Sequence, residues 1–127
     1  MKRESKEDKK RGMKTTKQRQ RERQDFLFRK HFFSKYRVRF IKNLKCEVTG
    51  ELNCVNAHMK SRGAGGDYRD IVPLSWECHT DFDEMPMEKF EKKYGRTKDS
   101  VRKTSWQYVK LWETELERRR KEGERWR

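Results

Sequence analysis

Hydrophobic residues are scarce in this sequence, making up 31% of its 127 residues, where an ordinary globular chain has roughly 45–50%. So short a chain with so few apolar side chains cannot bury a large single core. No stretch approaches the ~20 consecutive apolar residues that a membrane span requires. The basic N-terminus is not followed by the apolar block of a signal peptide. We expect one compact domain with charged extensions and no membrane partner.

Cysteine is also too rare for a secreted scaffold. The three cysteines, Cys46, Cys54 and Cys78, are few and odd in number, whereas small secreted domains depend on several paired cysteines. We therefore expect a cytoplasmic protein whose cysteines are small buried apolar side chains.

Positive charge is what the sequence has in excess. Charged residues make up 44%, and 35 Lys and Arg against 21 Asp and Glu give a net charge of +14. A charge of this size favours a polyanionic partner, and nucleic acid is the most plausible one.

Composition divides the chain into four segments. Residues 1–25 hold 11 Lys and Arg against 5 Asp and Glu, which predicts a disordered tail or a lone solvated helix. This tail either keeps the protein soluble or grips DNA. Residues 26–45 alternate aromatic and basic side chains and predict a helical flank whose aromatic stripe joins the core. Residues 46–95 form the central module, and residues 96–127 predict an amphipathic basic helix.

Within the central module, turn and cap residues predict the order strand, loop, strand, helix. Residues 47–53 are typical of a hairpin turn between two short strands. Residues 61–67 predict a glycine-rich loop, and residues 71–74 a buried extended segment. Ser75 is expected to cap a helix, which ends near Pro86.

The C-terminal segment predicts a single helix over residues 97–120. Its apolar face recurs at helical spacing and consists of Val101, Ser105, Tyr108, Val109, Trp112 and Leu116. A basic run from Arg118 to Lys121 lies at the end of this segment, and the C-terminal helix is the main DNA grip if the N-terminal tail is not.

Two of the three histidines fall in the central module. His79 and Asp83 stand four residues apart, so one helix face presents both, and together they could supply half of a divalent-cation site. His58 ends a predicted strand and could deprotonate a water molecule. The surface pairing of a histidine and a carboxylate is the plainer interpretation. His31 lies among phenylalanines and is interpreted as a packing or phosphate-contact residue.

Several short motifs follow one another in a fixed order within the central module. Residues 57–67 read Ala-His-Met-Lys-Ser-Arg-Gly-Ala-Gly-Gly-Asp, followed by Val-Pro-Leu at 72–74, Cys-His at 78–79 and Lys-Phe-Glu-Lys-Lys-Tyr-Gly at 89–95. This combination resembles the HNH endonuclease family, and in particular its small phage and prophage proteins. The resemblance covers residues 46–95. It implies an α+β fold with a ββα-metal module, in which two strands and a helix hold one divalent ion.

The resemblance also implies roles for individual residues. His58 matches the general base, and Asp70 occupies the position of the middle Asn, which keeps the base oriented. His79 matches a metal-binding histidine, and Asp83 falls where many members carry another. Mg²⁺ or Mn²⁺ suits this donor set best, because hard ions accept carboxylate, water and phosphate oxygens; Zn²⁺ or Ni²⁺ stays possible.

The sequence departs from the family pattern at several positions. Asp70 lacks the amide donor of Asn, so its loop hydrogen bond must use a different partner. Many members carry a further ligand where Ala57 stands, although the Ala-His subgroup does not. Many also carry two Cys-x-x-Cys pairs, but here each pair retains one thiol, Cys46 with Thr49 and Cys78 with Ser75. A four-thiolate zinc site therefore cannot form.

The expected function is metal-dependent hydrolysis of DNA phosphodiesters by a phage or prophage HNH endonuclease in the host cytoplasm. Phage recombination or packaging proteins are possible partners. The basic residues expected to contact nucleic acid are Arg37, Arg39, Lys60, Arg62 and Arg69. Two alternatives stay open: a catalytically degenerate HNH fold that only binds DNA in recombination or packaging, and a basic RNA-binding protein.

Overall fold

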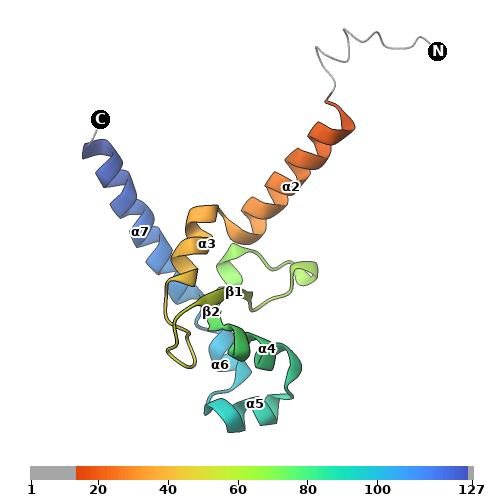
Figure 1. The fold of residues 1–127 in the computed structure, drawn as a ribbon, viewed down its shortest axis with the longest axis vertical. Coiled ribbons are helices and arrows are strands. Elements are labelled where there is room, and N and C mark those ends of the chain that lie inside the picture. The colour runs from red at the N-terminus through yellow and green to blue at the C-terminus, as the bar shows by residue number, and fades with distance from the viewer. Residues whose placement is uncertain (1–13, 126–127) are drawn as a thin grey trace, which may run out of the picture.

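The computed structural model describes residues 14–125 and has an α+β fold. In chain order its elements are α2 (Thr16–Phe32), α3 (Lys35–Lys42), β1 (Cys54–His58), the short 3-10 helices η1 (Arg62–Ala64) and η2 (Tyr68–Asp70), β2 (Ile71–Ser75), α4 (Trp76–Glu84), α5 (Met87–Tyr94), α6 (Lys98–Arg102) and α7 (Ser105–Arg125). Figure 1 shows α2 and α7 diverging from the sheet region, whereas α4, α5 and α6 gather on its other side.

Helix α2 begins inside the segment that composition assigns to a charged tail. The Thr15 hydroxyl accepts a hydrogen bond from the Gln18 backbone N at 3.1 Å, and the Gln18 side chain accepts one from the Thr15 N at 2.8 Å. This capping box starts the helix, and Lys, Arg, Gln and Glu then continue it because they are good helix formers. Residues 16–25 are therefore helical, so the disordered form of the prediction is wrong for them. Residues 1–13 of the predicted tail lie outside the described residues.

The aromatic stripe of the flank is interrupted between α2 and α3. Phe33 has a φ of +71°, which ends α2, and the Ser34 hydroxyl accepts a hydrogen bond from the Arg37 N, which starts α3. The stripe therefore does not lie along one helix face. Phe26 is 60% exposed and Tyr36 is 52% exposed, so the prediction that the stripe joins the core is wrong for these side chains.

The central sheet consists of β1 and β2 paired antiparallel, with Cys54 opposite Ser75 and His58 opposite Ile71. The expected order of strand, glycine loop, strand and helix is confirmed for residues 54–84. The hairpin expected at residues 47–53 is wrong. There the Cys46 N donates to the Glu51 O at 2.8 Å and the Gly50 N to the Cys46 O at 2.9 Å, so the segment is a compact turn that closes on itself and precedes the sheet.

The helix after β2 begins and ends as predicted. The Ser75 hydroxyl accepts a hydrogen bond from the Cys78 N at 3.3 Å and caps α4. The helix ends at Glu84, and Pro86 then stands at the N-cap of α5.

The C-terminal segment contains two helices where the sequence predicts one. α6 ends at Arg102, and the Thr104 hydroxyl donates to the Val101 O at 2.7 Å. This side-chain bond competes with the helical backbone pattern and separates α6 from α7. Within residues 14–125, every helix is too short or too polar to cross a lipid bilayer.

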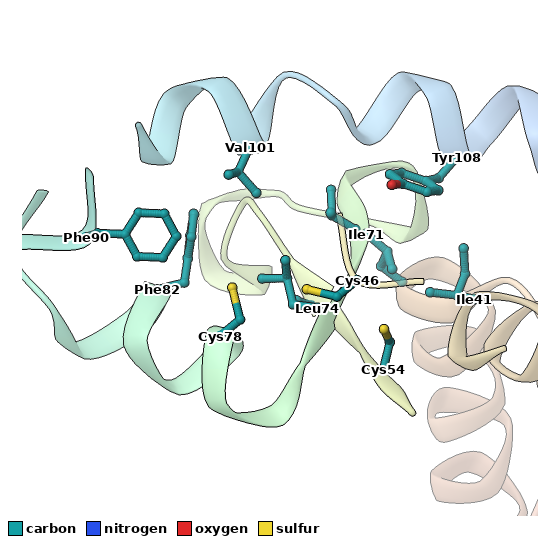
Figure 2. Packing of buried hydrophobic residues seen from close by; sticks show 12 residues of the cluster. Ile41, Cys46, Cys54, Ile71, Leu74, Cys78, Phe82, Phe90, Val101 and Tyr108 are labelled. Atoms are coloured by element: carbon teal, nitrogen blue, oxygen red, sulfur yellow. The ribbon is translucent and has the colours of Figure 1, made fainter. Parts of the chain in front are cut away.

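One core joins the sheet to the C-terminal helices, and Figure 2 shows part of it. Its buried hydrophobic members are Ile41, Cys46, Cys54, Ala57, Ile71, Val72, Leu74, Cys78, Phe82, Phe90, Val101 and Tyr108. All three cysteines are free and buried, as predicted. Because α6 and α7 each contribute to this core, the segment after residue 95 is a structural part of the domain.

Candidate active site

His58 lies at the end of β1, where the last turn of α2 packs against it. Its Nε2 atom is 2.7 Å from the His31 carbonyl oxygen, and the Phe32 ring meets its ring edge to face at 5.1 Å between centroids. Since a carbonyl oxygen only accepts hydrogen bonds, Nε2 must carry the proton. In the neutral ring the lone pair is then on Nδ1, and this atom would act as the base.

His31 is a site residue whose role the sequence did not reveal. It is buried, its Nδ1 lies 3.1 Å from the Gly66 carbonyl oxygen, and its ring lies 6.0 Å from the His58 ring. The side chain of His31 therefore fixes the glycine loop while its backbone fixes His58. The position of His31 among phenylalanines was the only signal in the sequence, and it did not point to contacts 27 and 35 residues away.

The glycine loop between the strands closes on its own backbone. The Ala64 N and the Gly66 N both donate to the Ser61 carbonyl, at 3.1 and 3.0 Å. A Cβ atom on Gly66 would lie 2.1 Å from the Lys60 O. Only glycine fits at this position while the loop is closed.

Asp70 braces the exit of this loop. Its carboxylate accepts a hydrogen bond from the Asp67 N at 2.9 Å, and its backbone O accepts one from the Met59 N at 2.9 Å. Asp70 lacks the amide donor of the Asn that the family carries at this position, and its carboxylate instead accepts from the backbone N of Asp67. The His31 carbonyl also orients the His58 ring, through its contact with Nε2.

His79 and Asp83 lie on α4 at the expected spacing. The His79 Nε2 is 3.3 Å from an Asp83 carboxylate oxygen, and the side chains are 29% and 62% exposed. The Trp76 ring packs against the His79 ring at 6.5 Å and is itself largely exposed. The pair is open to solvent and could offer one nitrogen and one carboxylate to an ion.

Two features bear on whether these residues fit a divalent ion. His58 and Ser75, which caps α4, lie at opposite ends of the sheet, four residue steps or about 13 Å apart along a strand. Among the described residues no group of three or more His, Cys, Asp or Glu side chains could hold a metal ion. The pair on α4 therefore fits an ion that keeps mostly water or phosphate oxygens, as Mg²⁺ does, and does not fit a closed zinc site.

The five basic residues expected at nucleic acid have different environments. Lys60 and Arg39 are exposed. Arg69 is also exposed, but its guanidinium is paired with the Asp67 carboxylate at 2.6 Å, which holds the pKa of that carboxyl below its usual range. The side chain of Arg62 lies outside the described residues.

Arg37 is fully buried, so the prediction that it contacts nucleic acid does not hold for this structure. Its guanidinium stacks over the Tyr68 ring at 5.2 Å. None of its three guanidinium nitrogens has a hydrogen-bond partner among the described residues. Burial lowers the pKa of Arg37 to about 10. The side chain therefore joins α3 to η2 from inside the protein.

The two incomplete Cys-x-x-Cys pairs meet in space. The Thr49 N donates to the Cys46 Sγ at 3.4 Å, and the Cys46 and Cys78 thiols are hydrogen-bonded to each other. That contact lowers the pKa of Cys46 and raises the pKa of Cys78. Hydrogen bonds and packing thus connect the turn before β1 to α4.

No family model matches this chain, and comparisons with curated proteins and with solved structures find no similar chain.

Proposed function

We propose that this protein is a metal-dependent DNA endonuclease of the HNH type. The observation that carries the proposal is the His58 ring, held at the end of β1 by the His31 carbonyl beside a closed glycine loop. The order β1, glycine loop, β2 and α4, with His79 and Asp83 on that helix, supports it. Together with the motif resemblance and the charge of +14, these features favour a phosphodiester as substrate.

In the proposed reaction, the Nδ1 atom of His58 takes a proton from a water molecule, and the resulting hydroxide attacks the phosphorus atom. The bond from phosphorus to the 3′ oxygen breaks, and this oxygen leaves with the bonding electrons and takes a proton from solvent water. The Nε2–H bond to the His31 carbonyl fixes the tautomer of the neutral ring before the proton transfer and holds the orientation of the ring throughout. His79 and Asp83 would hold the divalent ion, which supplies stabilisation of the charge that develops on the phosphate oxygens.

A plasmid-nicking assay with Mg²⁺ or Mn²⁺ tests this proposal. His58→Ala should slow nicking by about 100-fold or more, the contribution typical of a general base, and leave DNA affinity nearly unchanged. His79→Ala should slow nicking and lower the affinity for the metal ion, and Asp83→Asn should have the same effects to a smaller extent. Thr80→Ala, on the same helix, is the matched control, because the Thr80 hydroxyl donates a hydrogen bond to the Trp76 carbonyl within that helix. A wild-type protein that does not nick, or an active His58→Ala variant, contradicts the proposal.

A degenerate HNH fold that binds DNA without cutting it is the second candidate. It is favoured by the lack of a three-donor group among residues 14–125. In that case wild type and His58→Ala bind DNA equally, and neither nicks it with any divalent ion.

A further inference from the structure

The two long helices carry the same number of cations but very different numbers of anions. Helix α2 has six Lys and Arg against two Asp and Glu. Helix α7 also has six, but against five Glu. As separate surfaces, α2 is strongly basic and α7 is nearly neutral.

Pairing within α7 neutralises its basic run. Arg118 lies 2.5 Å from both Glu115 and Glu122, and Arg120 lies 2.6 Å from Glu117. Arg119 stacks over the Trp112 ring at 5.3 Å and lies 3.9 Å from Glu115. The arginines that made this run look like a nucleic-acid grip are thus already engaged.

Among residues 14–125 the cations of α2 have no such ion pair, although Lys30 lies near enough to Asp67 to help lower the pKa of that carboxyl. They are Lys17, Arg19, Arg21, Arg23, Arg29 and Lys30, and none forms an ion pair with a carboxylate among the described residues. Every residue of the helix up to position 30 is exposed, and Figure 1 shows the helix leaving the body of the protein. Arg19 and Arg23 are one turn apart, and such like-charged neighbours repel each other. An anionic partner lying along the helix would relieve that repulsion.

Dimensions point to duplex DNA as this partner. A helix of 17 residues is about 25 Å long and spans several phosphates of a duplex. The major groove of B-DNA is about 12 Å wide and admits an α-helix, whereas the major groove of duplex RNA is too narrow and deep.

We propose that α2, and not the basic run of α7, is the surface that binds duplex DNA. The binding itself does not depend on nuclease activity. One further step does rest on the proposed function: because the His31 carbonyl ends α2 and holds His58, DNA bound along α2 is directed toward the candidate base.

Two charge-matched triple variants test this proposal in the full-length protein. Arg19→Gln/Arg21→Gln/Arg23→Gln removes three cations from α2, and Arg118→Gln/Arg119→Gln/Arg120→Gln removes three from α7. Binding to a fluorescent DNA duplex is measured by anisotropy over a series of salt concentrations, with EDTA present so that no cleavage occurs. Circular dichroism and thermal melting confirm that both variants fold.

The α2 variant should reduce the magnitude of the slope of log K against log salt by about 2–3, since each lost phosphate contact contributes ~0.9 to that magnitude. The α7 variant should change the slope by less than about 1. Equal losses in both variants, or a larger loss in the α7 variant, overturn the proposal. Equal or tighter binding to duplex RNA of the same sequence overturns the assignment to DNA. A protein that fails to nick plasmid but shows the α2 effect refutes only the nuclease.

Discussion

The Nε2 atom of His58 lies 2.7 Å from the carbonyl oxygen of His31, so the last turn of α2 orients a ring that belongs to β1. The two residues are 27 positions apart in the chain. Any displacement of the end of α2 therefore moves the candidate base, although α2 carries no other residue of the proposed reaction.

Phe32→Ala tests this dependence. The Phe32 ring packs on the His58 ring at 5.1 Å, and its loss should let His58 rotate and lower kcat by about tenfold, or ~1.4 kcal/mol, with DNA affinity unchanged. Phe28→Ala is the control, because Phe28 is exposed and stacks on Phe32 from outside. Nitrogen NMR of the wild-type ring should show the proton on Nε2; a proton on Nδ1 would contradict the arrangement.

Arg37 provides a test of stability that is independent of function. Its buried guanidinium has no hydrogen-bond partner among the described residues, and burial of such a charge costs free energy. Arg37→Met should leave the free energy of unfolding unchanged or raise it by about 1 kcal/mol. Arg37→Ala should lower it by about 2 kcal/mol, because it leaves a cavity. Urea unfolding measures both, and a large loss in the Met variant would show that the charge itself stabilises the fold.

Asp81 joins α4 to α5 and should confer a pH dependence on stability. Its carboxylate accepts hydrogen bonds from Lys93 at 2.6 Å and from the Tyr94 hydroxyl. These bonds lower the pKa of Asp81 below its usual value and raise the pKa of Lys93.

The stabilisation from the Asp81 pair is therefore complete above the unfolded carboxyl pKa near 3.9 and is lost as the pH falls through the lower pKa of the folded state. Lys93 retains its charge in the folded state to a higher pH than in the unfolded chain. Asp81→Asn should lower the melting temperature at neutral pH and reduce the decline of the melting temperature as the pH falls below the unfolded carboxyl pKa. Thr80→Ala should retain the decline. An Asp81→Asn variant with the wild-type acid profile would exclude this role for Asp81.

The cysteines should be inert to chelators, and burial should shield them from reagents even though the lowered pKa of Cys46 favours its reactive thiolate. The Cys46 and Cys78 thiols are hydrogen-bonded to each other, and Thr49 and Ser75 stand where a zinc site would need two further thiols. Burial raises the pKa of Cys54 to about 11. EDTA should therefore leave the melting temperature unchanged. Ellman's reagent should modify the thiols only as the protein unfolds, since all three are buried. Fast modification in the native state would contradict this packing.

The local elements of the central module were the predictable part of the fold. The cap at Ser75, the end of α4 before Pro86 and the spacing of His79 and Asp83 depend on residues three or four positions apart, and such short-range relations are visible in a sequence. The turn at 47–53 was misjudged because its residues suit a hairpin as well as the closed turn that packs Cys46 against Cys78.

The contacts that define the candidate site were not predictable, since they join distant segments. Nothing in the local sequence indicates that the His31 carbonyl meets His58, or that Arg37 turns inward onto Tyr68. The number of Lys and Arg alone also does not distinguish the two basic helices. The arginines of α7 pair with glutamates three or four positions away, whereas among the described residues those of α2 form no ion pair with a carboxylate.

The closed glycine loop determines which additions this protein can accept. Gly66 has no room for a side chain and receives the His31 ring, while Gly63, with open space around it, lies at the outer part of the same loop. A fluorophore attached to a cysteine introduced at position 63 would extend into solvent and leave the anchor at Gly66 intact. A peptide inserted between Ser61 and Gly66 would instead break the hydrogen bonds that close the loop and displace the carbonyl that contacts His31, so the loop tolerates a new side chain at its outer part and no added backbone.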